Sequence, residues 1–294
     1  MTLFLKGLVQ ENVHSEVIER KTMDKIQKSD YHEIRRKANE ILEMFTELKV
    51  NLHTTSYLYI LLSNTIKNFS QENTPFEMFD ALYVNRLYDA IMFIHKSNNK
   101  KKYLKDITKG TLDFQDRKHS HAKNILFELE LAHRISIKFE DVKLDEPDIV
   151  VKFADGDVGI ACKKVTSNNN LEKQLSKGVK QIKLNGFLFG IVAINIDNLT
   201  PEGSILKQDT VKMALDKLHD LNMGFIKKNE RHFLKYLKES RLIAVIIHSS
   251  VVADIPSASP RFNNLSQTTM WTMKGLEEKL KDKVGLFKVL ESTS

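Results

Sequence analysis

Apolar side chains in the first hundred residues recur at the three- and four-residue spacing that is typical of amphipathic helices. Pro75 lies where the first turn of one such helix is expected. A basic, polar stretch at residues 97–106 interrupts the pattern and predicts a linker or an exposed crossing. We therefore expect residues 1–110 to form an all-helical domain with little strand. Its predicted helices are residues 34–48, 58–66 and 78–94.

The pattern changes after residue 115, where short apolar runs alternate with helical segments. Asp155-Gly156 separates two of these runs and is typical of a tight hairpin turn. A run that is almost entirely apolar, residues 187–196, predicts a strand buried on both faces. The predicted elements are a helix at 117–134, strands at 135–139, 148–153 and 158–164, a helix up to residue 184, a strand at 187–196, a helix within 206–238, a strand at 241–248 and a last helix near 276–284.

This order predicts a mixed sheet in an α/β domain at residues 111–294. Three consecutive strands joined by short connections form an antiparallel meander. The helix that follows them returns the chain to a parallel strand beside the third. We therefore expect helices to flank a mixed sheet in the second part of the chain.

Strand alternation selects one of two adjacent lysines as a partner for an acid. In the strand at 158–164, Ala161 and Lys163 point to one face, whereas Cys162 and Lys164 point to the other. A hairpin that turns at residues 155–156 brings Asp148 opposite this end of the strand. Asp148 and Lys163 are therefore expected to approach each other.

The helix before these strands carries an acid on its apolar side. On a helical wheel, Glu128 lies among the apolar residues between positions 125 and 135. A carboxylate directed toward a core is unfavourable unless it meets a partner or a metal. Glu130 and Arg134 lie on the polar side, where we expect an ordinary surface pair four residues apart.

At these residues the chain resembles the PD-(D/E)xK nuclease superfamily, the restriction-endonuclease-like fold. The resemblance rests on Glu128 in FELELA, Pro147-Asp148 in EPDIVV, Lys163 in IACKK and Gln181 in GVKQI. It covers about residues 117–197 and leaves the helical half outside. The fold that it implies is a restriction-endonuclease-like mixed sheet flanked by helices.

The resemblance also implies an activity, the hydrolysis of phosphodiester bonds in DNA. Asp148 would be the principal ligand of Mg²⁺ (or Mn²⁺), and Glu128 an outer or second ligand. Lys163 would orient the attacking water or stabilise charge on the phosphoryl group, and Gln181 would contact substrate or water. Residues of this type suit the reaction, which needs a positioned water, a proton acceptor and positive charge at the phosphate.

Ala161 departs from the family pattern, which has an acid two residues before the lysine. Three outcomes follow from this substitution. Glu128 or Asp157 replaces the missing ligand, the site works with fewer carboxylates, or catalysis is lost and the fold is kept for binding. A plainer interpretation is that Asp148 and Lys163 are only the charged ends of two strands.

Basic residues near this segment are candidates for contact with nucleic-acid phosphates. Several lie at the start of the helix that carries Glu128, and others form a stripe on the helix that carries Gln181. A solvated helix face is the alternative for both groups. The candidate nucleic-acid-binding residues are Arg117, Lys118, Lys123, Lys164, Lys173, Lys177 and Lys180.

The composition restricts the function class only moderately. The net charge of +7 is spread along the chain, so it is compatible with polyanion binding and equally with ordinary solubility. A single cysteine, Cys162, excludes an intramolecular disulfide and fits a reducing compartment. No apolar run approaches the length of a membrane span, so we expect a cytoplasmic protein without membrane contact. Glycine-rich nucleotide-binding motifs are absent from the sequence.

These observations favour a Mg²⁺-dependent endonuclease that acts on DNA, with RNA as an alternative substrate and anti-phage defence as the setting that the family suggests. Two other functions stay open. One is a non-catalytic nucleic-acid-binding module on a degraded nuclease fold. The other is a helical interaction protein, in which the N-terminal half mediates homodimerisation or contact with a protein partner.

Overall fold

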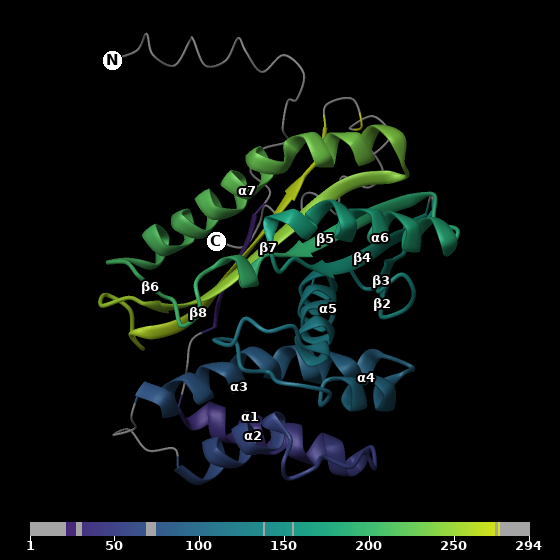
Figure 1. Cartoon of the computed structure of the whole chain (residues 1–294). Helices are drawn as coiled ribbons and strands as arrows, with labels where there is room; N and C mark the ends of the chain where they lie inside the picture. The colour runs from purple at the N-terminus through teal and green to yellow at the C-terminus, as the bar shows by residue number, and fades with distance from the viewer. Residues whose placement is uncertain are drawn as a thin grey trace, which may run out of the picture.

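The computed structural model describes residues 22–27, 31–68, 75–137, 139–154, 156–273 and 276. Its centre is a mixed eight-stranded sheet with the strand order β1-β8-β7-β5-β4-β3-β2, in which β6 also pairs with β7 (Figure 1). The strands are β1 (Thr22–Gln27), β2 (Val142–Lys143), β3 (Ile149–Val151), β4 (Val158–Lys164), β5 (Phe189–Asn195), β6 (Ile205–Lys207), β7 (Leu242–Asp254) and β8 (Phe262–Trp271). The helices are α1 (Tyr31–Glu47), α2 (Tyr57–Asn68), α3 (Pro75–Phe93), α4 (Lys100–Asp106), α5 (His121–Ser136), α6 (Leu171–Leu184) and α7 (Val211–Glu239).

The predicted order of antiparallel and parallel strands is confirmed in the middle of the sheet. β2, β3 and β4 form an antiparallel meander, and α6 then returns the chain to β5, which is parallel to β4. β7 is also parallel to β5. The chain is therefore α/β with a mixed sheet, and the carboxyl ends of β4, β5 and β7 lie at one edge.

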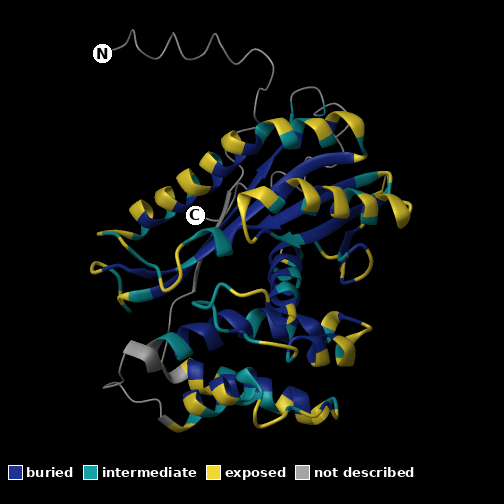
Figure 2. Ribbon diagram, viewed as in Figure 1, coloured by how far each residue is buried: buried dark blue, intermediate teal, exposed yellow. Residues whose placement is uncertain are grey.

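Helices cover both faces of this sheet. α6 and α7 lie on one face, while α5 and the N-terminal helices lie on the other (Figure 1). Each face of the sheet has its own hydrophobic core, and side chains of β4 alternate between them. Ala161 packs with the α6 and α7 side chains, whereas Cys162 packs with those of α5. Most of the sheet is buried, whereas the outward sides of α6 and α7 are exposed (Figure 2).

The N-terminal part differs from the prediction in two ways. The three predicted helices are present as α1, α2 and α3, but β1 pairs with β8 and joins the large sheet, so these residues are not all helical. The predicted linker at residues 97–106 contains α4, which buries Tyr103 and Leu104. Buried side chains of α1–α3 continue into those of α5 and β4 as one core.

The second half also departs from the predicted elements. The predicted strand at residues 135–139 is wrong, because α5 continues through Ser136 and β2 begins only at Val142. β8 was not predicted, because its buried positions carry polar side chains in place of an apolar run. These side chains meet partners in the core: Ser266 and Thr268 accept from Arg134, Thr269 accepts from Asn222, and Asn264 donates to the Leu82 carbonyl. The predicted last helix at 276–284 lies outside the described residues apart from Leu276.

Candidate functional site

Asp148 and Lys163 meet at the edge formed by β3 and β4, as the sequence predicted. Ile149 pairs with Ile160, so Asp148 lies beside the end of β4. The Cys162 amide donates to Asp148 Oδ2 over 2.6 Å, and Lys163 Nζ reaches the same oxygen at 3.2 Å. The Asp148 and Lys163 side chains are only 16% and 15% exposed. This partial burial makes their ion pair stronger than one on an open surface.

Gln181 on α6 completes the cluster. Its Oε1 accepts from Lys163 Nζ at 2.7 Å, and its Nε2 donates to Asp148 Oδ1 at 3.0 Å and to the Pro147 carbonyl. Gly178, one turn earlier on α6, allows this approach, because a Cβ there would lie 2.9 Å from Val192 Cγ2 of β5. We define Asp148, Lys163 and Gln181 as the Asp148 cluster.

Glu128 lies on α5, on the opposite face of the sheet, and its carboxyl interacts electrostatically with Asp148 and Lys163. Burial and the charge of Asp148 raise the pKa of Glu128 to about 8, while Lys163 acts in the opposite direction. Burial also raises the pKa of Asp148, against the stabilising effect of Lys163 and of the Cys162 amide. Repulsion by the Asp148 charge is therefore one cause of the Glu128 shift, and a proton or a cation would relieve it.

The donor set determines which metal this space suits. Asp148 and Glu128 supply hard carboxylate oxygens, which Mg²⁺ and Mn²⁺ accept together with waters and phosphate oxygens. Ala161 is fully buried on the α6 face and offers no side-chain ligand. Asp157 precedes β4 while Lys163 lies near its end, about 20 Å away along an extended strand, so Asp157 does not replace the missing acid. Two carboxylates therefore fit a divalent cation held partly by substrate. In the part of the chain that the structure describes, no group of three or more His, Cys, Asp or Glu side chains could hold a metal by itself.

Tyr103 interacts electrostatically with this site, which the sequence pattern did not predict. Burial and the charges of Glu128 and Asp148 raise the pKa of Tyr103 above its ordinary value. Tyr103 lies on α4, in the stretch that was interpreted as a linker because of its lysines. The aromatic and apolar pair Tyr103-Leu104 within that stretch was the available signal.

The prediction that Glu130 and Arg134 form a surface pair is wrong, because both side chains are buried. Glu130 binds Arg86 of α3 in a bidentate ion pair, with Arg86 Nε–Oε1 and Nη2–Oε2 distances of 2.6 and 3.0 Å. Arg86 Nη2 also lies 3.5 Å from Asp197 Oδ2. Arg134 donates instead to hydroxyls of β8. Partners from α3 and β8 make these polar positions part of the core, which helical periodicity does not reveal.

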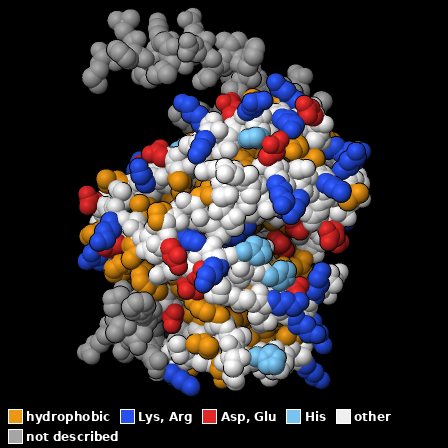
Figure 3. All heavy atoms as spheres, in the orientation of Figure 1, with side chains coloured by type: hydrophobic (Ala, Val, Ile, Leu, Met, Phe, Trp, Pro, Cys, Tyr) orange, Lys and Arg blue, Asp and Glu red, His pale blue; other side chains and the backbone are white. Residues whose placement is uncertain are grey.

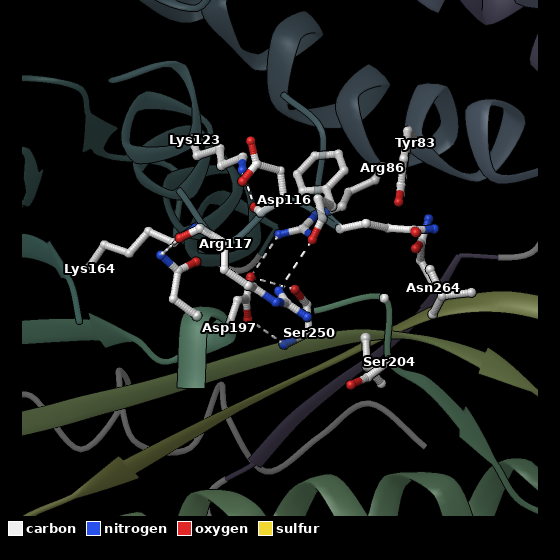
Figure 4. Close-up of a pocket in the computed structure, with 16 residues that line it drawn as sticks. Tyr83, Arg86, Asp116, Arg117, Lys123, Lys164, Asp197, Ser204, Ser250 and Asn264 are labelled. Carbon is white, nitrogen blue, oxygen red and sulfur yellow. Dashed lines mark hydrogen bonds and ion pairs between the residues drawn. The ribbon is translucent and has the colours of Figure 1, made fainter. Parts of the chain in front are cut away.

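Most of the predicted nucleic-acid-binding residues lie either on the exposed face of α6 or around a small cavity. Lys173, Lys177 and Lys180 are exposed on α6, where basic side chains gather in Figure 3. Arg117, Lys123 and Lys164 line a small cavity of about 30 Å³ between α5, α3 and the sheet (Figure 4). Burial lowers the pKa of Lys123, and it lowers that of Lys164 to about 8. Lys118 is exposed and lines neither.

A buried histidine beside this polar core predicts a specific loss of stability in acid. Burial and the Arg134 charge lower the pKa of His248 to about 3, so protons bind the unfolded chain more readily. The stability that this adds is fully present above pH 6.5 and is lost as the pH falls toward 3. Between pH 6.5 and 4.5 we expect a loss of about 2–3 kcal/mol from this group.

The measurement is urea unfolding at several pH values, with His248→Gln beside an exposed control, His53→Gln. His248→Gln should flatten the pH dependence between 6.5 and 4.5, whatever its effect at pH 7. The control should retain the slope of the wild type. An unchanged slope in His248→Gln would contradict the assignment.

The fold and the polar cluster define an α/β protein with two polar sites at the carboxyl edge of its parallel strands. Comparison of the chain with protein-family models, with curated proteins and with solved structures found no match. Among the described helices, none has the length and apolar character required to cross a bilayer.

Proposed function

We propose that the protein is a metal-dependent endonuclease and that the Asp148 cluster is its active centre. The observation that carries the proposal is the convergence of Asp148, Lys163 and Gln181 from β3, β4 and α6, with Glu128 close to Asp148. The order α5–β2–β3–β4–α6–β5 and its strand directions are those that the resemblance to PD-(D/E)xK nucleases leads one to expect.

Each member of the cluster has a chemical role in this proposal. Asp148 and Glu128 would hold Mg²⁺ or Mn²⁺, which when bound supplies Lewis-acid stabilisation of phosphoryl charge. Lys163 places a positive charge next to the phosphate and orients the attacking water. Gln181 fixes the positions of the Lys163 ammonium and the Asp148 carboxylate, because its amide forms hydrogen bonds with both.

DNA is the proposed substrate because an exposed basic surface adjoins the cluster. Lys173, Lys177 and Lys180 lie on the same helix as Gln181 and remain accessible. A backbone laid along α6 would bring a phosphate toward Lys163. These lysines would contact backbone phosphates, which DNA and RNA share, so RNA is tested as a second substrate.

The test is cleavage of supercoiled and linear DNA and of single-stranded RNA, with Mg²⁺, with Mn²⁺ and with a chelator. Nicking or linearisation that requires the metal supports the proposal. Salt-sensitive binding without cleavage would favour the non-catalytic module. Absence of both would favour an interaction protein. The replacement of the expected third acid by buried Ala161 is the observation that supports the non-catalytic alternative.

A stability measurement tests the metal site without relying on activity. The raised pKa of Glu128 means that stability is lost as the pH rises from about 4.5 through 8, since the buried carboxyl must ionise. Glu128→Gln should therefore be more stable than the metal-free wild type at pH 8.5, by about 4–5 kcal/mol. Mg²⁺ should stabilise the wild type and have little effect on the variant.

The measurement is urea unfolding at pH 6 and 8.5 with and without Mg²⁺, and Glu140→Gln, an exposed acid, is the control. Equal Mg²⁺ stabilisation of the wild type and Glu128→Gln would remove Glu128 from the metal site. Glu140→Gln should follow the wild type in all four conditions.

A further inference from the structure

The cavity that contains Lys164 lies where open α/β sheets commonly bind ligands. Lys164 is the last residue of β4, Asp197 follows β5, and Ser250 lies in β7. These three strands are parallel, so their carboxyl ends meet at this cavity. Ligands of α/β sheets bind in crevices outside the carboxyl ends of the strands.

Positive charge exceeds negative charge among the cavity side chains. Four cations line the cavity, against the two acids Asp116 and Asp197. Asp197 is already satisfied, because it accepts from the Ser250 amide and hydroxyl, both at 2.7 Å, and from Asn195 at 3.1 Å. Its pKa lies well below the usual range, since the Arg86 and Lys164 charges outweigh burial. The cations are Arg86, Arg117, Lys123 and Lys164.

Two donors around the cavity lack partners. Arg117 Nε is buried without a hydrogen-bond partner, while Arg117 Nη1 and Nη2 donate to the Phe114 and Pro201 carbonyls. The Lys164 ammonium makes no hydrogen bond or ion pair with the residues that the structure describes. In Figure 4, Lys164 and Arg117 extend into the cavity from different elements. Unsatisfied buried donors are unfavourable, so their concentration at one place indicates a missing acceptor.

We propose that this cavity binds the phosphoryl group of a small anion, either inorganic phosphate or a nucleoside monophosphate. A tetrahedral anion offers acceptors in several directions, which suits the free donors of Arg117 and Lys164 at this cavity. The cavity is small, about 30 Å³, so a sugar or base would lie outside it. This site is distinct from the Asp148 cluster, because Lys163 and Lys164 point to opposite faces of β4.

The experiment is isothermal titration of the full chain with inorganic phosphate, adenosine monophosphate and uridine monophosphate, at one ionic strength and without metal. Adenosine is the uncharged control. Equal affinity for the three phosphates identifies a site for the anion alone. Tighter binding of the monophosphates identifies a nucleotide as the source. Both results support a phosphoryl site, whereas no binding of any of the three at about 10 mM overturns it.

Variants locate the binding. Lys164→Met and Arg117→Gln should each weaken phosphate binding about tenfold or more, because each removes a charge-assisted donor. Lys118→Met is the matched control and should bind as the wild type does.

Unchanged affinity in both Lys164→Met and Arg117→Gln would overturn the site. Loss of affinity in Lys163→Met alone would assign the anion to the Asp148 cluster and also overturn it. Thermal unfolding of each variant verifies that it is folded. Because Lys164 and Arg117 lie outside the Asp148 cluster, failure of this proposal leaves the nuclease proposal untouched, and the converse also holds.

Discussion

Asp148→Asn and Lys163→Met should each lower metal-dependent DNA cleavage by about a hundredfold to ten-thousandfold while leaving the fold intact. Asparagine keeps the shape of Asp148 and an acceptor for the Cys162 amide, but it loses the charge that would hold the cation. Methionine keeps the length of Lys163 and removes the ammonium that bonds to Asp148 and Gln181.

The measurement is the single-turnover cleavage rate as a function of Mg²⁺ concentration, with the thermal midpoint of each variant as a test of folding. Asp141→Asn and Lys152→Met are matched controls, because both residues are exposed on the same meander and carry the same charges. The controls should cleave at the wild-type rate. Wild-type cleavage by Asp148→Asn would place the active centre elsewhere.

Arg86→Leu should have the largest effect on stability, lowering the free energy of unfolding by about 3–5 kcal/mol. Burial disfavours a charge, but Glu130 and Asp197 hold the pKa of Arg86 above its ordinary value. Leucine would leave these two carboxylates in a dry environment without their shared cation. Truncating one member of a buried ion pair is costly chiefly because the remaining charges lose their partner.

Urea unfolding measures this loss, and Arg36→Leu is the control. Arg36 forms exposed pairs with Glu33 and Glu40, so its replacement should change stability far less than Arg86→Leu does. In Arg86→Leu/Glu130→Leu the loss should be smaller than the sum of the single losses, because each change removes the charge that the other leaves unpaired. An Arg86→Leu protein as stable as the Arg36→Leu control would contradict the assignment.

The approach of Asp148 to Lys163 could be predicted because its causes are local. β3 ends at Val151 and β4 begins at Val158, so the connection is longer than the tight turn predicted at Asp155-Gly156. Alternation along β4 still decides that Lys163, and not Lys164, faces Gln181. The mixed sheet was predictable for the same reason, since a short-looped meander and a helical crossover allow few strand arrangements.

Glu130 shows where sequence reasoning failed and why. Helical spacing placed it on the polar side of α5, and Arg134 one turn later offered an apparent partner. Its actual partner, Arg86, lies 44 residues earlier on α3. A polar helix face can be buried when another element brings the opposite charge, and periodicity carries no information about that element.

The strand β8 could not be predicted from the sequence for a related reason. Asn263, Asn264, Ser266, Gln267, Thr268 and Thr269 are all buried, so the strand shows no apolar alternation. It is held between β1 and β7, and its polar side chains reach donors and acceptors on α3, α5 and α7. A strand whose buried side chains are polar is stable only when distant elements supply hydrogen-bond partners for them.

The sequence by itself determined the helices of the N-terminal part, the meander with its crossover, and the pairing of Asp148 with Lys163. Each of these depends on turn chemistry, periodicity or alternation over a few residues. The tertiary structure alone decided that Lys164, Arg117 and Lys123 line one cavity and that Arg86 joins Glu130 and Asp197. These residues are up to 111 positions apart, and only the packing of α3, α5 and the sheet brings their charges within interaction distance.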